Sequence, residues 1–305
     1  MILDLIGDVL WDTHLAVPHL PTPGQEARAT SRRRLLGGTA AHVARWLRLL
    51  ELAGLYPFTP PAIRLWAVLD AEAASALPSC DTSACPLAPQ ISEVYALTRP
   101  DGEKAMISLV PPDLPPRPLP ITSTFFYLSA YTLLASDASE RIVAPCERLI
   151  AQGAQMVFDL APLAHQMDGA LARRLIGRAR IALGNDGEWL EVFKASSIED
   201  TIRAALALGA ASVHIKRGEH GSILARADGS RAEVPAAPCR PVNSTGAGDA
   251  YTAAALAALV AGRADQWAQR LAAFCGALHT EQRPDSENIA ALGRFLASLK
   301  DKHAL

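Results

Sequence analysis

Two glycines and an aspartate, Gly246, Gly248 and Asp249, stand in the segment 243–251 (NSTGAGDAY), directly before an alanine-rich apolar run. A helix that begins here leaves its first backbone N–H groups without intrahelical partners, and its dipole adds partial positive charge at the same place. Glycines let a phosphate approach the backbone closely because they carry no Cβ atom. The segment therefore predicts a helix start that receives a phosphate group.

Asp249 suits a different role from that of a phosphate ligand. Its carboxylate would repel the phosphate, whereas as a base it can take the proton of a hydroxyl that attacks the phosphorus. The segment thus indicates phosphoryl transfer. The structural alternative is a first-turn aspartate that favours the helix dipole beside a flexible loop.

Other nucleotide-binding patterns are absent from the sequence. It contains no Gly-x-x-x-x-Gly-Lys-Ser/Thr segment and no protein-kinase His-Arg-Asp loop. The first predicted strand is not followed by Gly-x-Gly-x-x-Gly, and the glycine pair lies near the other end of the chain. These observations disfavour a dinucleotide-dependent oxidoreductase.

The elements that must position this segment alternate between strand-like and helical stretches. Short apolar runs predict strands over residues 2–7, 63–70, 94–100, 103–110, 125–133, 155–160, 180–185 and 212–218. Helical spacing predicts helices over residues 37–54, 138–153 and 197–210. This alternation predicts an α/β fold, with a doubly wound, mainly parallel sheet flanked by helices on both faces.

Two stretches interrupt this alternation, residues 10–36 and about 86–120. The second contains two strand-like runs around Asp101-Gly102, a good hairpin signal, followed by the proline-rich run 111–120. We assign both stretches to a small β lid inserted in a single domain that spans residues 1–305. Another hairpin is predicted over 222–234, with its turn at Asp228-Gly229.

Composition excludes several classes of partner. The 305 residues carry 29 Lys and Arg against 31 Asp and Glu, so no net field favours nucleic acid or an anionic membrane. The longest apolar run, about a dozen residues, is too short to cross a bilayer, and we recognise no export signal. Five scattered cysteines complete no zinc pattern and are interpreted as reduced thiols of a cytoplasmic protein.

The segment NSTGAGDAY resembles the C-terminal signature of the ribokinase-like carbohydrate kinases, the pfkB family. Four further segments resemble motifs of that family in the same order: GDVLWD (7–12), GGTAAHVA (37–44), GNDGE (184–188) and KRGEHG (216–221). The resemblance covers nearly the whole chain. It implies a ribokinase-like fold with a β lid, and transfer of the ATP γ-phosphoryl group to a primary hydroxyl of a small sugar.

The resemblance also implies roles for particular residues. Asp249 would be the general base, and the anion hole would consist of the amides of Gly246, Ala247 and Gly248. The substrate would be held by Asp12, Gly37, Gly38 and His42. The ATP would be held by Asn185, Lys216, Gly218, Gly221 and Thr245, and Mg²⁺ would be placed by Glu188 and Asn185.

The chain departs from the family pattern at several positions. His42 stands where the family usually has Asn, so it either contacts the substrate or packs on a helix face. Asn243 replaces an Asp in a neighbourhood that often binds a monovalent cation, which leaves a role for K⁺ open. Asp159 lacks the Asn and Arg that often follow it, which indicates a structural role. The exposed edges of the lid are compatible with a homodimer through the lid.

Two alternatives to a sugar kinase remain at this point. One is a nucleoside kinase of the same fold, acting on a ribose 5′-hydroxyl. The other is a non-catalytic relative that binds a sugar or a nucleotide. Retention of Asp249 with both glycines disfavours the second alternative, because a protein that only binds has no need of a base.

Overall fold

The described residues form two sheets. Several of the predicted site residues lie at the ends of strands in the larger one. The computed structural model describes residues 1–77, 80–101, 103–109, 123–134, 137, 139–160 and 166–301. Within these residues the main sheet has eight strands, in the spatial order β12 (Arg231–Val234), β11 (Ser222–Arg226), β10 (Ser212–Lys216), β9 (Ile181–Asn185), β8 (Gln155–Asp159), β7 (Phe125–Ser129), β1 (Ile2–Ile6) and β4 (Ala62–Trp66).

In the main sheet the strands β4, β1, β7, β8, β9 and β10 run parallel to one another, and the hairpin of β11 and β12 adds two antiparallel strands next to β10. Strand β1 lies between β4 and β7, so the chain winds outward from β1 in both directions. Ligands of open α/β sheets bind beyond the carboxyl ends of the strands at such a reversal. The topology therefore predicts a ligand site at the carboxyl ends of β1 and of β7 to β10.

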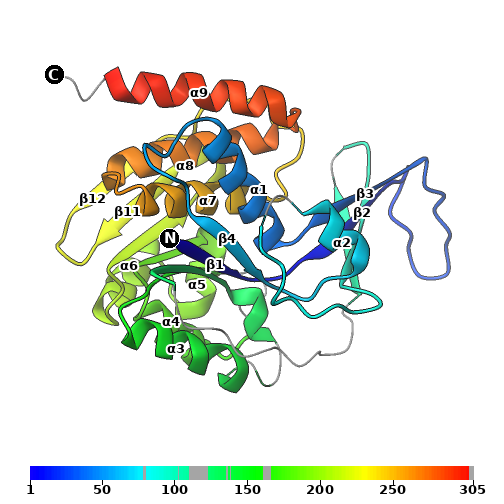
Figure 1. Ribbon diagram of the computed structural model, residues 1–305. Coiled ribbons are helices and arrows are strands. Elements are labelled where there is room, and N and C mark those ends of the chain that lie inside the picture. The colour runs from blue at the N-terminus through cyan, green and yellow to red at the C-terminus, as the bar shows by residue number, and fades with distance from the viewer. Residues whose placement is uncertain are drawn as a thin grey trace.

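Helices cover both faces of the main sheet (Figure 1). One face packs against α1 (Thr39–Leu52), α7 (Ala247–Val260) and α8 (Asp265–Thr280), and α9 (Asp285–Asp301) lies outside this layer against α1 and α8. The other packs against α3 (Ala144–Ala151), α4 (Gly169–Ile176), α5 (Asp186–Phe193) and α6 (Ile198–Ala207). Two separate apolar cores result, because strands buried on both faces contribute alternate side chains to each layer.

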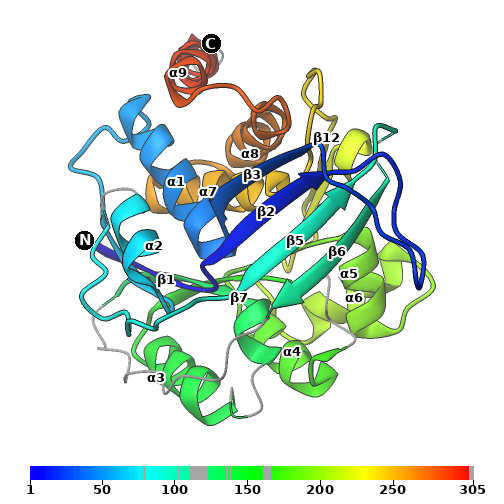
Figure 2. The ribbon, with the colours of Figure 1, turned by 90° about the vertical axis from the view of Figure 1, so that its right-hand side faces the viewer.

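The second sheet is smaller and contains four strands among the described residues. Their order is β3 (Ser31–Gly37), β2 (Leu10–Ala16), β5 (Glu93–Thr98) and β6 (Lys104–Leu109). Figure 2 shows this sheet in front of the end of the main sheet, where α1 and α7 also begin. The short helix α2 (Ala71–Ala76) lies beside it. The arrangement fits the predicted lid.

Helix α7 is apolar all round its axis. The side chains from Ala250 to Ala258 are all buried, and most of them are alanines, so the neighbouring helices α1 and α8 can approach closely. Such a helix has no freedom to shift without opening the core. Its first turn therefore provides a rigid support for Gly248 and Asp249.

The predicted doubly wound α/β fold with a β lid is confirmed, while two predicted strands are too long. Strand β4 ends at Trp66, and Asp70 instead caps α2; strand β7 ends at Ser129, and a 3₁₀-helix follows over Ala130–Leu134. Both runs stay mainly apolar beyond the end of the strand, and such a run does not distinguish a strand from a buried helical turn.

Parts of four predictions lie outside the described residues: Gly102 of the lid turn, residues 110–120 of the second lid stretch, residue 110 of the strand 103–110 and residue 138 of the helix 138–153. The predicted hairpin at Asp228-Gly229 is present as β11 and β12. Of the helices that the structure describes, none is both long and apolar enough to span a bilayer.

Candidate active site

The residues predicted to bind ATP and the phosphoryl group gather at the carboxyl ends of strands in the main sheet. Asp159, Asn185 and Lys216 end β8, β9 and β10, three neighbouring parallel strands. The first turn of α7, with Asp249, begins at the same edge, since Gly248 lies close to the Lys216 side chain. Segments separated by up to 90 residues in sequence are thus brought to one place.

Gly246 forms the turn that leads into α7. Its backbone angles, φ 85° and ψ −3°, are those of the third residue of a type II turn, a conformation that favours glycine. The Ala247 amide closes this turn by donating to the Ser244 carbonyl oxygen at 3.1 Å. The prediction that the Ala247 amide is a free donor is therefore wrong. Among the described residues, no acceptor is in place for the amides of Gly246 and Gly248.

The Asp249 side chain lies at the carboxyl ends of these strands and is not fully buried in the core. Its side chain is 17% exposed, and its Oδ2 atom lies 2.9 Å from Nδ1 of His42 on α1. His42 was predicted to contact the substrate or to pack on a helix face; the structure places it against the predicted base. A contact between residues 207 positions apart has no signal in a single sequence.

A second histidine, His279 on α8, completes this cluster and was not singled out from the sequence. Its Nε2 atom lies 2.8 Å from the Thr245 carbonyl oxygen, and its Nδ1 atom accepts a hydrogen bond from the Trp46 indole at 2.9 Å. Burial lowers the pKa of His279 to about 4, and the neighbouring His42 contributes in the same direction. The ring therefore stays neutral and links α1 to the turn before α7.

The predicted substrate residues lie where the lid meets α1. The Asp12 side chain, on β2, passes over Gly37 so closely that any Cβ atom there would collide with it. Gly38 precedes α1 with φ 92°, and an added Cβ would meet the Asp8 backbone. The Asp8 carboxylate accepts hydrogen bonds from the amide and hydroxyl of Thr39 at the start of α1. Burial raises the pKa of Asp12, although the nearby His42 opposes the shift.

Lys216 lies in the centre of the site and pairs with a buried carboxylate. Its Nζ atom is 2.7 Å from Oδ1 of Asp159, while the Thr252 hydroxyl donates to Oδ2 of the same carboxylate at 2.6 Å. Burial disfavours the ammonium, but the charges of Asp159 and Glu188 outweigh that cost and raise the pKa of Lys216. Asp159 therefore acts as a structural partner, in agreement with its interpretation from the sequence.

Asn185 and Glu188 form a reciprocal cap at the start of α5. The Asn185 side chain accepts from the Glu188 amide at 2.9 Å, and the Glu188 carboxylate accepts from the amide and side-chain NH₂ of Asn185 at 2.8 and 2.7 Å. Burial raises the pKa of Glu188 to about 7, against the influence of Lys216. This carboxylate changes its charge close to neutral pH.

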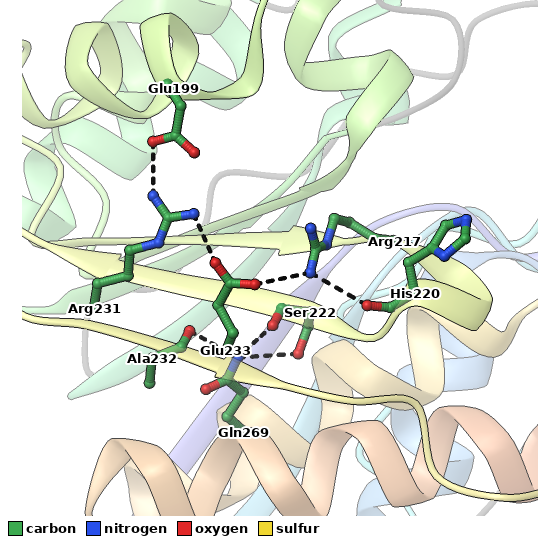
Figure 3. A network of polar contacts seen from close by, with 8 residues as sticks. All are labelled: Glu199, Arg217, His220, Ser222, Arg231, Ala232, Glu233 and Gln269. Atoms are coloured by element: carbon green, nitrogen blue, oxygen red, sulfur yellow. Dashed lines mark hydrogen bonds and ion pairs between the residues drawn. The ribbon is translucent and has the colours of Figure 1, made fainter.

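The predicted nucleotide loop, residues 216–221, is a tight turn between β10 and β11. Gly218 and Gly221 both have positive φ, and an added Cβ at Gly221 would collide with the Val234 carbonyl oxygen of β12. A chain of charged contacts supports the loop from one side (Figure 3). It runs from Glu199 on α6 to Arg231, Glu233 and Arg217, whose guanidinium also donates to the His220 carbonyl oxygen.

One contact joins the lid to the segment before α7. The Lys104 ammonium on β6 donates to the side-chain oxygen of Asn243 at 3.2 Å, and the Thr245 amide donates to the same atom at 3.1 Å. The lid face that carries Lys104 therefore points toward the turn at Gly246. The carboxylate that the resemblance predicts at position 243 is replaced by an amide that accepts from a lysine.

The carboxylates of the site suit Mg²⁺ only together with phosphate and water ligands. Among the residues that the structure describes, no group of three or more His, Cys, Asp or Glu side chains could hold a metal ion by itself. Mg²⁺ commonly keeps several waters and takes one or two carboxylates plus substrate phosphates. The Glu188 carboxylate beside the Asn185 amide fits that kind of site.

Comparisons with known proteins find a kinase family and its fold. A family model described as "pfkB family carbohydrate kinase" matches residues 117–290. A cytidine kinase from Thermococcus kodakarensis is 38% identical over 96 residues, which cover 30% of this chain and 34% of that protein, so the match spans about a third of the relative.

Two solved structures share the fold over almost their whole length. A nucleoside kinase of the ribokinase family from Methanocaldococcus jannaschii has a TM-score of 0.75 at 16% identity, covering 98% of this chain and 99% of that one. An aminoimidazole riboside kinase from Salmonella enterica, solved with its riboside and an ATP analogue, has a TM-score of 0.76 at 20% identity, covering 97% and 100%.

Proposed function

Because the chain belongs to the pfkB family of carbohydrate kinases, we propose that it transfers the γ-phosphoryl group of ATP to a primary hydroxyl of a small sugar or sugar-like substrate. The chain is a phosphotransferase with an alcohol group as acceptor. The observation that carries the residue assignment is Asp249, a partly exposed carboxylate in the first turn of a buried helix. It lies beside amides that have no acceptor among the described residues.

In the proposed reaction Asp249 takes the proton of the substrate hydroxyl. The hydroxyl oxygen then forms a bond to the γ-phosphorus, and the bond from that phosphorus to the bridging oxygen of ADP breaks. The amides of Gly246 and Gly248 would stabilise the negative charge on the transferred group, helped by the dipole of α7. The Ala247 amide is left out of this anion hole because the turn already uses it.

The nucleotide would lie over the ends of β9 and β10. Lys216, Gly218, Gly221 and Thr245 would contact ATP, and Glu188 with Asn185 would hold Mg²⁺ through its waters. Mg²⁺ supplies charge neutralisation on the phosphates when bound. The Lys216 ammonium lies close to Gly248, so it would face the transferred phosphoryl group.

A nucleoside is the second candidate substrate, and the lid favours it. Residues paired across neighbouring strands face the same side of a sheet. The strand register therefore places Val94, Ala96 and Met106 on the same face as Asp12 and Lys104. The same register also places the polar His14, Thr98 and Ser108 on this face. It therefore offers apolar side chains for contact with a base, next to polar groups that can bind ribose hydroxyls. The matched cytidine kinase and the riboside kinase act on compounds of this kind, by their names.

The deciding experiment measures ADP release with hexoses, pentoses, sugar phosphates and nucleosides, with and without K⁺. Asp249→Asn should lower kcat by about 10²–10⁴-fold, because it removes the base, while substrate affinity measured by calorimetry stays near that of the wild type. If no compound in the panel stimulates ADP release, or if the variant turns over normally, the non-catalytic alternative replaces the kinase.

We propose three further properties on the same basis. The two sheets form a single domain in which the lid closes over the substrate. Two copies associate through the lid, which the exposed Ile107 and Leu109 side chains of edge strand β6 support. The protein resides in the cytoplasm, in keeping with free thiols at all five cysteines.

A further inference from the structure

The His42 ring is enclosed on three sides at the start of α7. Its Nδ1 atom lies 2.9 Å from Asp249 Oδ2, and its ring stands edge-on to His279 with the ring centroids 5.5 Å apart. Gly246 lies against both rings: a Cβ atom there would be 2.8 Å from His42 Nδ1 and 2.7 Å from His279 Nε2. The side chain of His42 is only 15% exposed. The position of the ring is thus set by its neighbours.

The partners also set the protonation of both rings. A carboxylate only accepts hydrogen bonds, so Nδ1 of His42 must carry a hydrogen when it contacts Asp249. His279 accepts from Trp46 at Nδ1 and must donate from Nε2 to the Thr245 carbonyl oxygen, so it is neutral with a defined tautomer. A positive charge in this cluster therefore resides on His42.

Titratable and charged groups face His42 from four elements. Asp249 on α7 and Asp12 on β2 favour the imidazolium, whereas Arg45 on α1 disfavours it, and His279 on α8 is neutral. Burial also disfavours the charged ring, but the hydrogen bond and the charge of Asp249 prevail, so the pKa of His42 is raised above its usual value. Arg45 is itself paired with Asp285 on α9, which reduces its effect on the ring.

From this geometry we infer that His42 is a positioning residue of the catalytic base, and that its charge state controls how readily Asp249 accepts the substrate proton. The inference rests on the proposed kinase function. His42 holds Oδ2 of Asp249, which leaves Oδ1 for the hydroxyl of the substrate. When His42 is neutral, the carboxylate is oriented and can take the proton.

A charged His42 makes the transfer of the substrate proton to Asp249 less favourable. The imidazolium forms an ion pair with Asp249 and stabilises the ionised carboxylate, which then takes a proton less readily. Turnover should consequently fall as the pH is lowered through the pKa of His42, which is raised above its usual value. A residue that merely packed against α7 would produce no such dependence.

The contact itself can be tested without any turnover. NMR titration of the His42 ring in the wild type and in Asp249→Asn should show a pKa lower by about 1 unit or more in the variant, because the opposite charge is removed. The exposed His19 serves as an internal control that should not shift. An unchanged His42 titration would overturn the inference, even in a protein that proves to be an active kinase.

The role in turnover is tested with two substitutions that separate orientation from charge. His42→Gln keeps an N–H donor but never becomes charged, and His42→Ala loses both. We expect His42→Ala to lower kcat by about 10–100-fold with little change in KM, as expected for a misplaced catalytic group. His42→Gln should retain at least about tenfold more kcat than His42→Ala, and its acid limb should move to lower pH by about 1 unit or more.

The matched control is His19→Asn, which should keep the wild-type pH profile. Equal kcat values in the two His42 variants, or an acid limb that remains in place in His42→Gln, would refute the positioning role. Absence of turnover in the wild type itself would instead refute the proposed function, and the NMR titration would still decide whether the contact between His42 and Asp249 exists.

Discussion

The substitution Gly246→Ala tests the packing that brings Asp249 and the two histidines together. Gly246 has φ 85°, and a non-glycine residue in this left-handed region costs about 1–2 kcal/mol. The added Cβ would also lie 2.7 Å from His279 Nε2 and 2.8 Å from His42 Nδ1. Neither ring can yield easily, because His279 is held between Trp46 and Thr245, and His42 is held by Asp249.

Crowding of this kind in a packed interior costs a further 1–3 kcal/mol or so. The free energy of unfolding of Gly246→Ala should therefore be lower than that of the wild type by about 2–5 kcal/mol in total. In a protein of 305 residues that corresponds to a fall in Tm of roughly 3–8 °C. Urea unfolding followed by circular dichroism gives the first quantity, and calorimetry gives the second.

Gly248→Ala is the matched control, two residues away in the same turn. Gly248 has no positive φ, and the nearest atom to an added Cβ is Lys216 Nζ at 3.3 Å, at the end of a long side chain. Alanine is also the better helix former, by up to about 1 kcal/mol. The unfolding free energy of Gly248→Ala should stay within about 1 kcal/mol of the wild type. Equal losses in the two variants, or a stable Gly246→Ala, would refute this account of the turn.

Two further predictions concern the buried charges of the site. The pKa of Glu188 is raised from 4.5 to about 7 in the folded protein, so its contribution to stability is present below pH 4.5 and is lost as the pH rises to 7. The unfolding free energy of the wild type relative to Glu188→Gln should therefore fall by up to about 3 kcal/mol over that interval in urea titrations, and a constant difference would contradict the assignment. Lys216→Met leaves Asp159 without its cation and should cost about 3–5 kcal/mol. The double variant with Asp159→Asn should recover much of that loss, whereas additive losses in urea unfolding would show that the two side chains are energetically independent.

Much of the fold could be predicted from the sequence because its signals are local. Alternating apolar runs and helical spacings predicted the parallel sheet and its helices, and Asp-Gly predicted the β11–β12 hairpin. The glycines and the aspartate of NSTGAGDAY predicted the start of α7, since turn conformation and helix capping depend on neighbouring residues. The ends of β4 and β7 were missed, because continuous apolar runs carry no period that marks where a strand stops.

Contacts within the site depended on the tertiary structure. Asp249 meets His42 from 207 residues away, Trp46 meets His279 from 233, and Lys216 meets Asp159 from 57. These pairs form because parallel strands bring their carboxyl ends to one edge and because α1, α7 and α8 pack together there. The residue types of the chain therefore predicted the class of chemistry, phosphoryl transfer. The contact of His42 with Asp249 depended on packing between segments that are distant in sequence. The hydrogen bond of the Ala247 amide within the turn likewise became visible only in the structure.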